Sequence, residues 1–414
     1  MTQLPQGWRE AFLSDVCSSF QYGWTSRAEH GQGLGLLRTT DLTHPPVKWS
    51  EVPQCKELPK DIDKYLVRTG DFFISRAGSV GVSAFVEEVP RDCVFASYLI
   101  RLQASDRVVK RFLKWFLLSP EYWKQVGEAS AGIALQNINA TKLKSMLIPL
   151  PPLAEQERIV EILEEQFSRL DSALASVKAV REKAKAFRRS LLHAAFSGEL
   201  TGGTEGWREV ALGDISVVKG GKRLPKGTKW SPTPTAHPYI RATDVQATGI
   251  DIKSLVYVPD EVWSKISRYV VASGDVVITI AGTIGRTAVV PKLLDGANLT
   301  ENAAKIVLDK SVMASRFLDY FLKSPLAQEV IEGLSTSTTQ AKLALFRIET
   351  IDTPVPPLAT QERIVSLLEE QFSRLDKALE VANQLEARIA SERRSLLHSA
   401  FTGALTATWR ETHD

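Results

Sequence analysis

The sequence has few of the features that mark secreted, membrane-spanning or metal-binding proteins. It holds three cysteines, Cys17, Cys55 and Cys93, at spacings that fit neither a disulfide framework nor a zinc site. No apolar run approaches the ~20 residues that a transmembrane helix requires. The first residues, MTQLPQGWRE, lack the basic and apolar regions of a signal peptide. We therefore expect a reduced, cytoplasmic protein with no membrane segment and no metal site.

Catalytic signatures are missing as well. The chain has no P-loop, no HExxH motif, no nucleophile elbow and no CxxC pair. Its Pro-Pro pairs lack the flanking residues of an adenine-methyltransferase loop. His193 and His398 recur within the same SLLH tetrapeptide, with no carboxylate or nucleophile beside them in the sequence, so we expect a capping or partner-contact role for both. We predict that this chain contains no catalytic residue.

The chain also lacks a large charge of either sign. Its 414 residues include 51 Lys and Arg against 48 Asp and Glu, a net charge of +3, and 44% of them are hydrophobic. These proportions are typical of globular proteins and exclude wholesale disorder. At roughly 100–200 residues a domain, the length predicts two to four domains. The total charge by itself does not indicate a nucleic-acid partner.

The dominant positive feature is an internal duplication with an offset of about 205 residues. Residues 155–200 and 360–405 are identical at 26 of 46 positions, and a proline cluster precedes each copy. Upstream, GDFFISRAGSVG at 70–81 corresponds to GDVVITIAGTIG at 274–285, and GWRE also occurs twice. This period is far longer than that of a solenoid repeat. The predicted segments are variable blocks at 1–150 and 201–355, helical spacers at 151–200 and 356–405, and a tail at 406–414.

Each near-identical segment has the apolar spacing of a long helix that buries one seam. The proline clusters suit helix starts, and Gly198 and Gly403 suit helix ends. About 40 residues would form a rod of roughly 60 Å. After one shortened step we expect the seam to continue through Val180, Ala184, Phe187 and Leu191 in the first helix, and through Leu385, Ile389 and Leu396 in the second. The predicted seam residues are Val160, Leu163, Phe167, Leu170, Leu174, Val177, Val365, Leu368, Phe372, Leu375, Leu379 and Ala382.

Charge along these helices indicates how they pair. Residues 155–171 carry six acidic and two basic side chains, whereas 178–189 carry six basic and one acidic, and the second helix has a weaker gradient of the same kind. Antiparallel pairing places acidic halves against basic halves. We therefore predict an antiparallel intramolecular coiled coil. The alternative is that each helix packs separately on its own globular block.

The variable blocks have the pattern of α+β domains. Residues 72–75 and 276–280 are apolar β-formers that follow a Gly-Asp turn, so they are predicted to be strands. Residues 111–118 and 316–323 are predicted to be amphipathic helices that stop at Ser-Pro. The order of the strands is not encoded in any local signal.

Local charge suggests a nucleic-acid surface in these blocks. No acidic residue occurs between Asp214 and Asp244, a turn-rich stretch with six basic residues, and such a loop can approach phosphates. Asn and Gln side chains in polar loops can pair with adenine. A merely solvated loop remains the alternative for both. The candidate DNA-binding residues are Arg27, Arg38, Arg76, Gln136, Asn137, Asn139, Lys219, Lys222, Arg223, Lys226, Lys229, Arg241, Gln340 and Lys342.

Two divergent blocks that alternate with two near-identical helices resemble the specificity subunit of type I restriction-modification enzymes. The residues that carry the resemblance are the junctions at 149–160 and 354–365, the helix ends SLLHAAFSGEL and SLLHSAFTGAL, and the two GWRE starts. The resemblance implies two α/β target recognition domains separated by two long helices, with pseudo-twofold symmetry. A third WRE at 409–411 would be a remnant of duplication or a strap beside the N-terminus.

The resemblance also implies the function and the partners. Each recognition domain would read one half of a bipartite, asymmetric site in double-stranded DNA, and the helices would set the half-site spacing. Two modification (methyltransferase) subunits would dock on the helices, and restriction (translocase-nuclease) subunits would join them. This chain would not be an enzyme, and AdoMet, ATP and Mg would bind to the partner subunits. The alternative is a coiled-coil adaptor without sequence-selective DNA binding.

Overall fold

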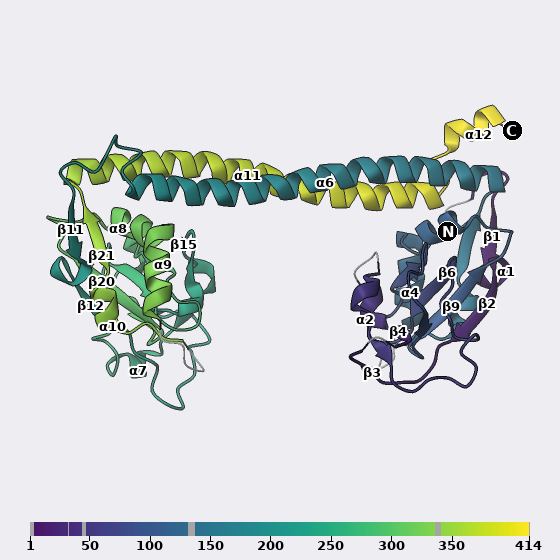
Figure 1. Ribbon diagram of the computed structural model, residues 1–414, viewed down its shortest axis with the longest axis horizontal. Coiled ribbons are helices and arrows are strands. Elements are labelled where there is room, and N and C mark those ends of the chain that lie inside the picture. The colour runs from purple at the N-terminus through teal and green to yellow at the C-terminus, as the bar shows by residue number, and fades with distance from the viewer. Residues whose placement is uncertain (1–3, 32, 44–46, 131–136, 336–340, 414) are drawn as a thin grey trace. The chain divides into compact units, whose positions relative to one another are not determined.

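The computed structural model describes residues 4–31, 33–43, 47–130, 137–335 and 341–413 (Figure 1). It divides into two compact units: unit 1 is Met1–Val177 with Asn383–Asp414, and unit 2 is Lys178–Ala382. Each unit therefore combines one variable block with parts of both long helices. This grouping differs from the linear series of blocks and spacers that the sequence predicts. None of the helices within the described residues is long and apolar enough to span a membrane.

Among the described residues, the block of unit 1 contains two four-stranded sheets, the two-stranded sheet β1-β10 and several short helices. The four-stranded antiparallel sheet has the order β2-β9-β6-β7, and the second sheet has the order β3-β5-β4-β8, with β4 and β8 parallel. Its elements are β1 (Arg9–Phe12), α1 (Leu13–Val16), β2 (Cys17–Tyr22), β3 (Ala28–Glu29), β4 (Gly35–Leu37), α2 (Thr39–Leu42), β5 (Gln54–Cys55), β6 (Asp71–Ser75), β7 (Ser83–Phe85), β8 (Cys93–Phe95), β9 (Leu99–Ala104), α3 (Lys110–Phe116), α4 (Pro120–Ser130), α5 (Ala140–Lys144) and β10 (Leu147–Leu150).

The block of unit 2 repeats the main sheet and the terminal strand pair (β11-β21), whereas its second sheet has the order β16-β13-β19 and β14-β15 form a separate pair. Its four-stranded sheet has the order β12-β20-β17-β18, and β13 pairs in parallel with β19 as β4 does with β8. Its elements are β11 (Arg208–Ala211), β12 (Ser216–Gly220), β13 (Pro238–Ile240), β14 (Val245–Gln246), β15 (Gly249–Ile250), β16 (Val256–Tyr257), α7 (Asp260–Trp263), β17 (Val276–Thr279), β18 (Thr287–Val289), β19 (Asn298–Leu299), β20 (Ala303–Leu308), α8 (Ser315–Leu322), α9 (Pro325–Leu334), α10 (Leu345–Glu349) and β21 (Asp352–Val355).

The central strands β6 and β17 are buried on both faces. Phe72 and Ile74 belong to the core under the helices, while Phe73 belongs to the core beneath the smaller sheet. Alternate side chains of a strand point to opposite faces, so one short apolar strand contributes to two cores. The Asp of each predicted Gly-Asp turn accepts a hydrogen bond from the amide three residues before it, at 2.9 Å in the first block and 2.8 Å in the second. The predicted strands are confirmed.

The predicted short helices are α3 and α8, and the Ser-Pro pair after each has a second role. Ser324 accepts a hydrogen bond from the amide of Ala327, and Pro325 is the first residue of α9. Proline suits that position because the first helical amide needs no partner within the helix. Ser-Pro therefore ends one helix and begins the next.

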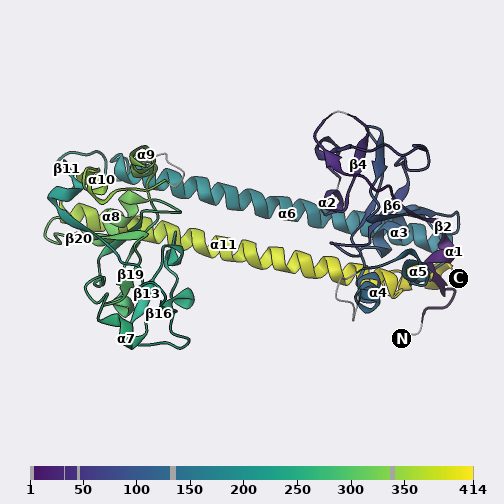
Figure 2. The ribbon, with the colours of Figure 1, turned by 90° about the horizontal axis from the view of Figure 1, so that it is seen from below.

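The two long helices begin and end where the prolines and glycines predict. Helix α6 spans Leu153–Phe196, and α11 spans Leu358–Phe401. Gly198 and Gly403 follow them with φ of 85° and 80°, the left-handed conformation that closes many helices. Within each unit the two helices lie side by side (Figures 1 and 2).

The helices pair antiparallel, as the charge gradient predicts. In unit 2, Arg188 Nη2 donates to Asp376 Oδ1 at 2.6 Å, and in unit 1, Arg393 forms the corresponding ion pair with Asp171. The two pairs occupy equivalent positions of the 205-residue repeat. Each unit therefore combines the start of one long helix with the end of the other, as antiparallel pairing requires.

The long helices pack on the blocks as well as on each other. The structure therefore combines the predicted antiparallel pairing with the alternative, in which the helices pack on the globular blocks. In unit 1 the block core includes Leu163 of α6 and Phe401 of α11. The Phe401 ring lies 5.1 Å from that of Phe112, and the Phe196 ring lies 5.2 Å from that of Phe317, measured between ring centroids. Each block thus contacts both helices.

The predicted seam is buried in its first part. Seven of its residues are buried and five are half-buried. The buried residues are Val160, Leu163, Phe167, Val177, Leu368, Phe372 and Ala382, and the half-buried ones are Leu170, Leu174, Val365, Leu375 and Leu379.

Beyond Val177 and Ala382 the predicted seam is confirmed at Ala184 and Ile389, which are buried, but the predicted shortened step is wrong. Val180, Phe187 and Leu385 are 44%, 47% and 42% exposed. The seven-residue spacing instead continues unbroken to the buried Ala184 and Ile389. Polar residues occupy intervening seam positions, including Arg188, Arg393, Arg181 and Glu386, all half-buried. Arg188 can lie there because its guanidinium stacks 4.5 Å from the Phe372 ring centroid while its charge meets Asp376.

A buried glutamine fastens the start of each long helix to its block. Gln361 Oε1 accepts a hydrogen bond from the amide of Ala314, before α8, while its Nε2 donates to the carbonyls of Val312 and Pro356, all at 2.8 Å. Gln156 makes the equivalent bonds to the amide of Val109 and the carbonyl of Pro151 in unit 1. We call these contacts the glutamine clamps. They explain why the QER sequence follows both proline clusters.

The tail forms α12 (Ala407–His413) and binds beside the N-terminal segment. The buried carboxylate of Glu155 accepts hydrogen bonds from Trp8 Nε1 at 2.8 Å, Thr406 Oγ1 at 2.6 Å and Arg410 Nη1 at 2.5 Å. The position equivalent to Glu155 in the second copy is Thr360, which has no carboxylate. Of the two readings of the third WRE, these contacts favour a strap.

All three cysteines are free and buried. Burial raises the pKa of the Cys17 and Cys93 thiols to about 12. At neutral pH both groups are therefore protonated and unreactive.

One glycine in each unit, Gly23 after β2 and Gly221 after β12, allows two backbone segments to approach closely at the end of the sheet. The amide of Gly221 donates to the carbonyl of Ala303, and Gly23 makes the equivalent bond to Leu99. A Cβ at Gly221 would lie 2.1 Å from the carbonyl oxygen of Thr300, and one at Gly23 would lie 2.3 Å from that of Ala96. Any larger residue would push the loop that follows away from the sheet.

We predict that Gly221→Ala destabilises unit 2 by about 1–3 kcal/mol, because the new methyl group overlaps backbone atoms that cannot rotate away. Thermal unfolding of the full chain measures this as a lower midpoint for the affected transition. Gly333→Ala is the matched control, since a Cβ there meets nothing within 4 Å and alanine favours the helix. An equal midpoint for both variants would contradict the close approach.

Candidate nucleic-acid interface

Beyond the ends of β2 and β12, the two blocks form the same set of backbone hydrogen bonds and bridges. We call this shared arrangement the backbone frame. After the two glycines, the amide of Trp24 donates to Phe95 and that of Lys222 donates to Leu299. Isolated bridges join Ala77 to Asn137 and Ala281 to Lys342 at the next turn. This alignment makes Thr25 equivalent to Arg223, Ser97 to Glu301, Tyr98 to Asn302, and Asn137 to Lys342.

Different side chains stand at these equivalent positions. In the first block they are neutral, and Tyr98 is 61% exposed. In the second block the corresponding positions include the charged residues Arg223, Glu301 and Lys342. The frame is therefore shared while the chemistry that it presents differs, which is what two readers of different sequences require.

The basic stretch of the second block is an exposed loop, as the sequence predicts. Lys219 lies in β12 opposite Lys305, and the chain then crosses over the sheet end as a loop to β13. Lys222, Arg223, Lys226 and Lys229 are all exposed. The Lys222 ammonium lies 5.8 Å from the Tyr269 ring centroid. The loop thus offers several cations to a phosphate backbone.

Two hollows adjoin this loop. One, of about 430 Å³, is lined by residues that include Arg223, Trp230, Arg241 and Glu301. The other, of about 610 Å³, includes Gly282 and Thr283. Both are lined by Ala242, Thr243 and Asn302, so the two hollows lie next to each other, and we call them together the concave surface of the second block.

Arg241 and Arg38 have structural partners that the sequence analysis did not assign. Arg241 donates through Nε and Nη2 to both oxygens of Asp244, at 3.0 and 2.7 Å, and Arg38 engages Asp41 in the same way at 3.1 and 2.8 Å. The hydrogen bond that each guanidinium donates to its aspartate is the main cause of the raised pKa of that guanidinium. These forks brace the turns after β13 and β4, and DNA contact by either arginine stays a prediction.

The first block places two of its candidates together. The Arg76 guanidinium lies 4.8 Å from the Tyr22 ring centroid, and Asn137 bridges to Ala77, the residue after Arg76. Asn139 instead caps α5, since its side chain accepts the amide of Lys142 at 2.8 Å. Arg27 is exposed. Gln136 and Gln340 lie outside the described residues.

Sequence reasoning missed Tyr98, Glu301 and Asn302. Each lies in the turn just before β9 or β20, where a single polar or aromatic residue carries no local signal. Only the alignment of the two frames identifies these positions. The GDFFISRAGSVG and GDVVITIAGTIG repeats could have located the neighbouring turn but not this one.

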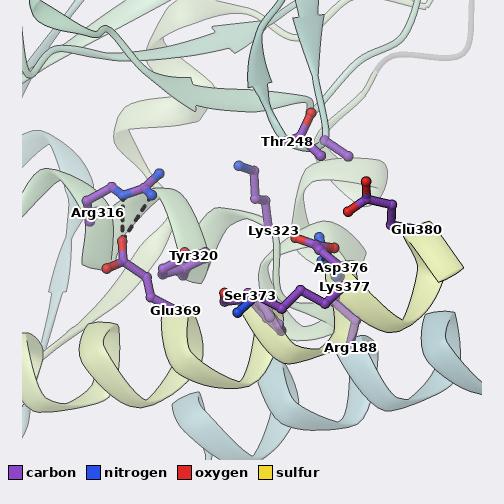
Figure 3. A pocket seen from close by; sticks show the side chains of 12 residues that line it. Arg188, Thr248, Arg316, Tyr320, Lys323, Glu369, Ser373, Asp376, Lys377 and Glu380 are labelled. Atoms are coloured by element: carbon purple, nitrogen blue, oxygen red, sulfur yellow. Dashed lines mark hydrogen bonds and ion pairs between the residues drawn. The ribbon is translucent and has the colours of Figure 1, made fainter.

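A third hollow, of about 520 Å³, lies where α8 and the β14–β15 turn meet the long helices (Figure 3). Its charges are largely paired with one another. Arg316 binds Glu369 at 3.0 Å, as drawn in Figure 3, and Lys323 binds the buried Asp319 at 2.9 Å. Arg111 and Glu164 form the same ion pair in unit 1, also at 3.0 Å. The conserved geometry of this pair between the units indicates a packing role rather than a catalytic one.

His398 has a carboxylate partner that the sequence did not reveal. Its Nδ1 lies 2.5 Å from Glu121 Oε1 of α4. The position equivalent to Glu121 in the second block is Leu326, so His193 lacks the corresponding partner there. This asymmetry favours a local structural contact. Within the described ranges no three His, Cys, Asp or Glu side chains gather closely enough to hold a metal ion.

Comparison with known proteins agrees with this architecture. The family model for the type I restriction modification DNA specificity domain matches residues 5–177 and 204–390. The EcoKI specificity subunit of Escherichia coli strain K12 is 26% identical over 99% of this chain and 91% of its own, and the Escherichia coli EcoBI specificity subunit is 27% identical over 74% and 68%.

A solved chain gives the same result for the fold. It comes from a structure concerned with complex assembly and conformational transition of the type I R-M system. It is 20% identical, with a TM-score of 0.76 over 96% of this chain and 98% of that one. Because the family model covers both halves of the duplication, the chain belongs to the type I restriction-modification specificity subunits.

Proposed function

We propose that each block reads one half of a bipartite, asymmetric site in double-stranded DNA. The observation that carries this proposal is the shared backbone frame on which Thr25 and Ser97 stand in one block and Arg223 and Glu301 in the other. Because the backbone frame is the same, both blocks could bind a DNA duplex in the same orientation. Because the side chains on the two frames differ, each block could recognise a different base sequence.

The long helices suit the docking of two copies of one partner. The ion pairs Arg188–Asp376 and Arg393–Asp171 repeat, as do Arg316–Glu369 and Arg111–Glu164. A duplicated surface lets two identical subunits bind equivalently. We propose two modification subunits as these partners, with restriction subunits joining through them, and helix length as the determinant of half-site spacing.

The chemistry of methylation and cleavage is proposed to lie in those partners. No catalytic motif is present in the sequence, so AdoMet, ATP and Mg are assigned to the other subunits. Three free, buried thiols are compatible with a reducing cytoplasm. A coiled-coil adaptor without sequence-selective DNA binding would not require different side chains at the equivalent positions of the two blocks.

Exchange of residues 1–150 for the block of another specificity subunit is expected to change only one half of the recognised site. The exchange carries both members of the β1–β10 pair, so this strand pairing stays within the exchanged block. Mapping of N6-methyladenine in a host with the complete system measures the outcome. The reciprocal exchange of residues 201–355 should change the other half alone, and a change in both halves after either exchange would contradict modular reading.

Insertion of one heptad into each long helix, after Ala179 and after Gln384, is expected to lengthen the gap between half-sites. Seven residues add about 10.5 Å of helix, or about three base pairs, and keep the seam in register. The same methylation map should show unchanged half-sites. A heptad in α6 alone is the control, because it displaces Arg188 from Asp376 and should lower the unfolding midpoint. An unaltered gap in the double insertion would refute the ruler.

The double variant Lys226→Ala/Lys229→Ala is expected to weaken DNA binding by the complex to a similar degree on all sequences. Each lost phosphate contact reduces the slope of log K against log salt by about 0.9. Binding titrations at several salt concentrations measure this. Lys310→Ala, an exposed lysine after β20, should leave the slope unchanged. A slope that stays constant in the double variant would place the phosphate contacts elsewhere.

A further inference from the structure

One ion pair stands out on the concave surface of the second block. Arg223 Nε donates to Glu301 Oε1 at 2.5 Å, although the arginine side chain is 77% exposed. The carboxylate is 29% exposed, and its Oε2 accepts a hydrogen bond from Thr300 Oγ1 at 3.1 Å. The guanidinium is thus held from one side while its outer edge faces solvent.

The outer edge of Arg223 offers two parallel donors. Its Nη1 and Nη2 have no hydrogen-bond partner in the part of the chain that the structure describes. Burial, the largest single effect, would raise the pKa of Glu301, but the hydrogen bonds from Arg223 and Thr300, a backbone hydrogen bond and the charge of Arg223 together lower it. The pair therefore stays charged at neutral pH, and the orientation of the arginine is set before any ligand arrives.

Two parallel N–H donors match one edge in duplex DNA better than any other. Guanine presents O6 and N7 side by side in the major groove, and arginine bonds both at once. A phosphate contact would need only a cation, and the neighbouring exposed lysines already supply several. We propose that Arg223, oriented by Glu301, reads a guanine in the half-site of the second block.

The first block lacks this chemistry at the same place. Its equivalent residues, Thr25 and Ser97, offer neither a guanidinium nor a carboxylate, so its half-site should not depend on a guanine read from this position. Glu301 acts here as a positioning residue, because it fixes the arginine rather than replacing it.

The inference rests on the proposed function, and one experiment separates the two. N6-methyladenine is mapped in hosts that carry the complete system with the natural chain, with Arg223→Ala or with Glu301→Ala. The natural chain should give a bipartite motif with a G·C pair in one half. In Arg223→Ala the preference for guanine at that one position should fall about 5- to 150-fold, with all other positions kept. Glu301→Ala should relax the same position.

Controls make every outcome decisive. Lys229→Ala, in the same loop, should lower methylation at all sites without altering the motif. Absence of any bipartite motif with the natural chain would overturn the proposed function itself. An unchanged motif in Arg223→Ala, or relaxation at a position other than a G·C pair, would overturn only the guanine inference.

If Arg223→Ala abolishes methylation altogether, the variant Arg223→Lys tests the guanine inference in its place. Lysine keeps the charge but not the two parallel donors. A relaxed guanine position with lysine supports the inference, whereas full discrimination would reduce Arg223 to a simple cation and overturn it.

Discussion

The arrangement of each unit depends on one buried amide. Gln361 binds the backbone before α8 and the backbone at the proline junction, and Gln156 does the same in unit 1. A buried amide left without these partners would cost about 1–3 kcal/mol, which favours the direction in which the long helix leaves its block. The packing of each block core on both long helices, through residues such as Leu163 and Phe401 in unit 1, supports the same direction.

The pairing of the two long helices also fixes their register, which is the position of one helix along the other. The seam is not a pure hydrophobic stripe, because half-buried Arg188 and Arg393 occupy positions that a stable coiled coil would fill with leucine. Each reaches an aspartate on the opposite helix, and a slip by one turn would separate both ion pairs. Such polar seam residues lower stability but select one register and one orientation. Because of the duplication, each unit contains one such ion pair, so the register of the two helices is selected in the same way in both units.

Much of the fold could be predicted because its signals are local. Prolines, glycines and heptad spacing located the long helices, and the Gly-Asp turns located β6 and β17. Beyond Val177 the sequence placed Ala184 and Ile389 in the seam correctly. It placed Val180 and Phe187 there wrongly because they are apolar, and it missed Arg188 because the aspartate across the coil is not evident from the sequence. In the candidate site, the loop around Arg223 followed from charge alone. Glu301 and Tyr98 did not, because their position depends on a sheet end assembled from distant strands. The aspartates that bind Arg38 and Arg241 were visible three residues downstream, within LRTTDL and IRATDV.

The anchoring of α12 at Glu155 affects how the chain is made. Unit 2 is one continuous stretch, Lys178–Ala382, whereas unit 1 needs Phe401 for its core and Arg410 for its buried carboxylate. During synthesis, which runs from the N-terminus, the first block therefore emerges long before its partners. The second unit can be complete while the first still exposes the surface that α11 will cover. The part of the protein that is translated first is the last to finish folding.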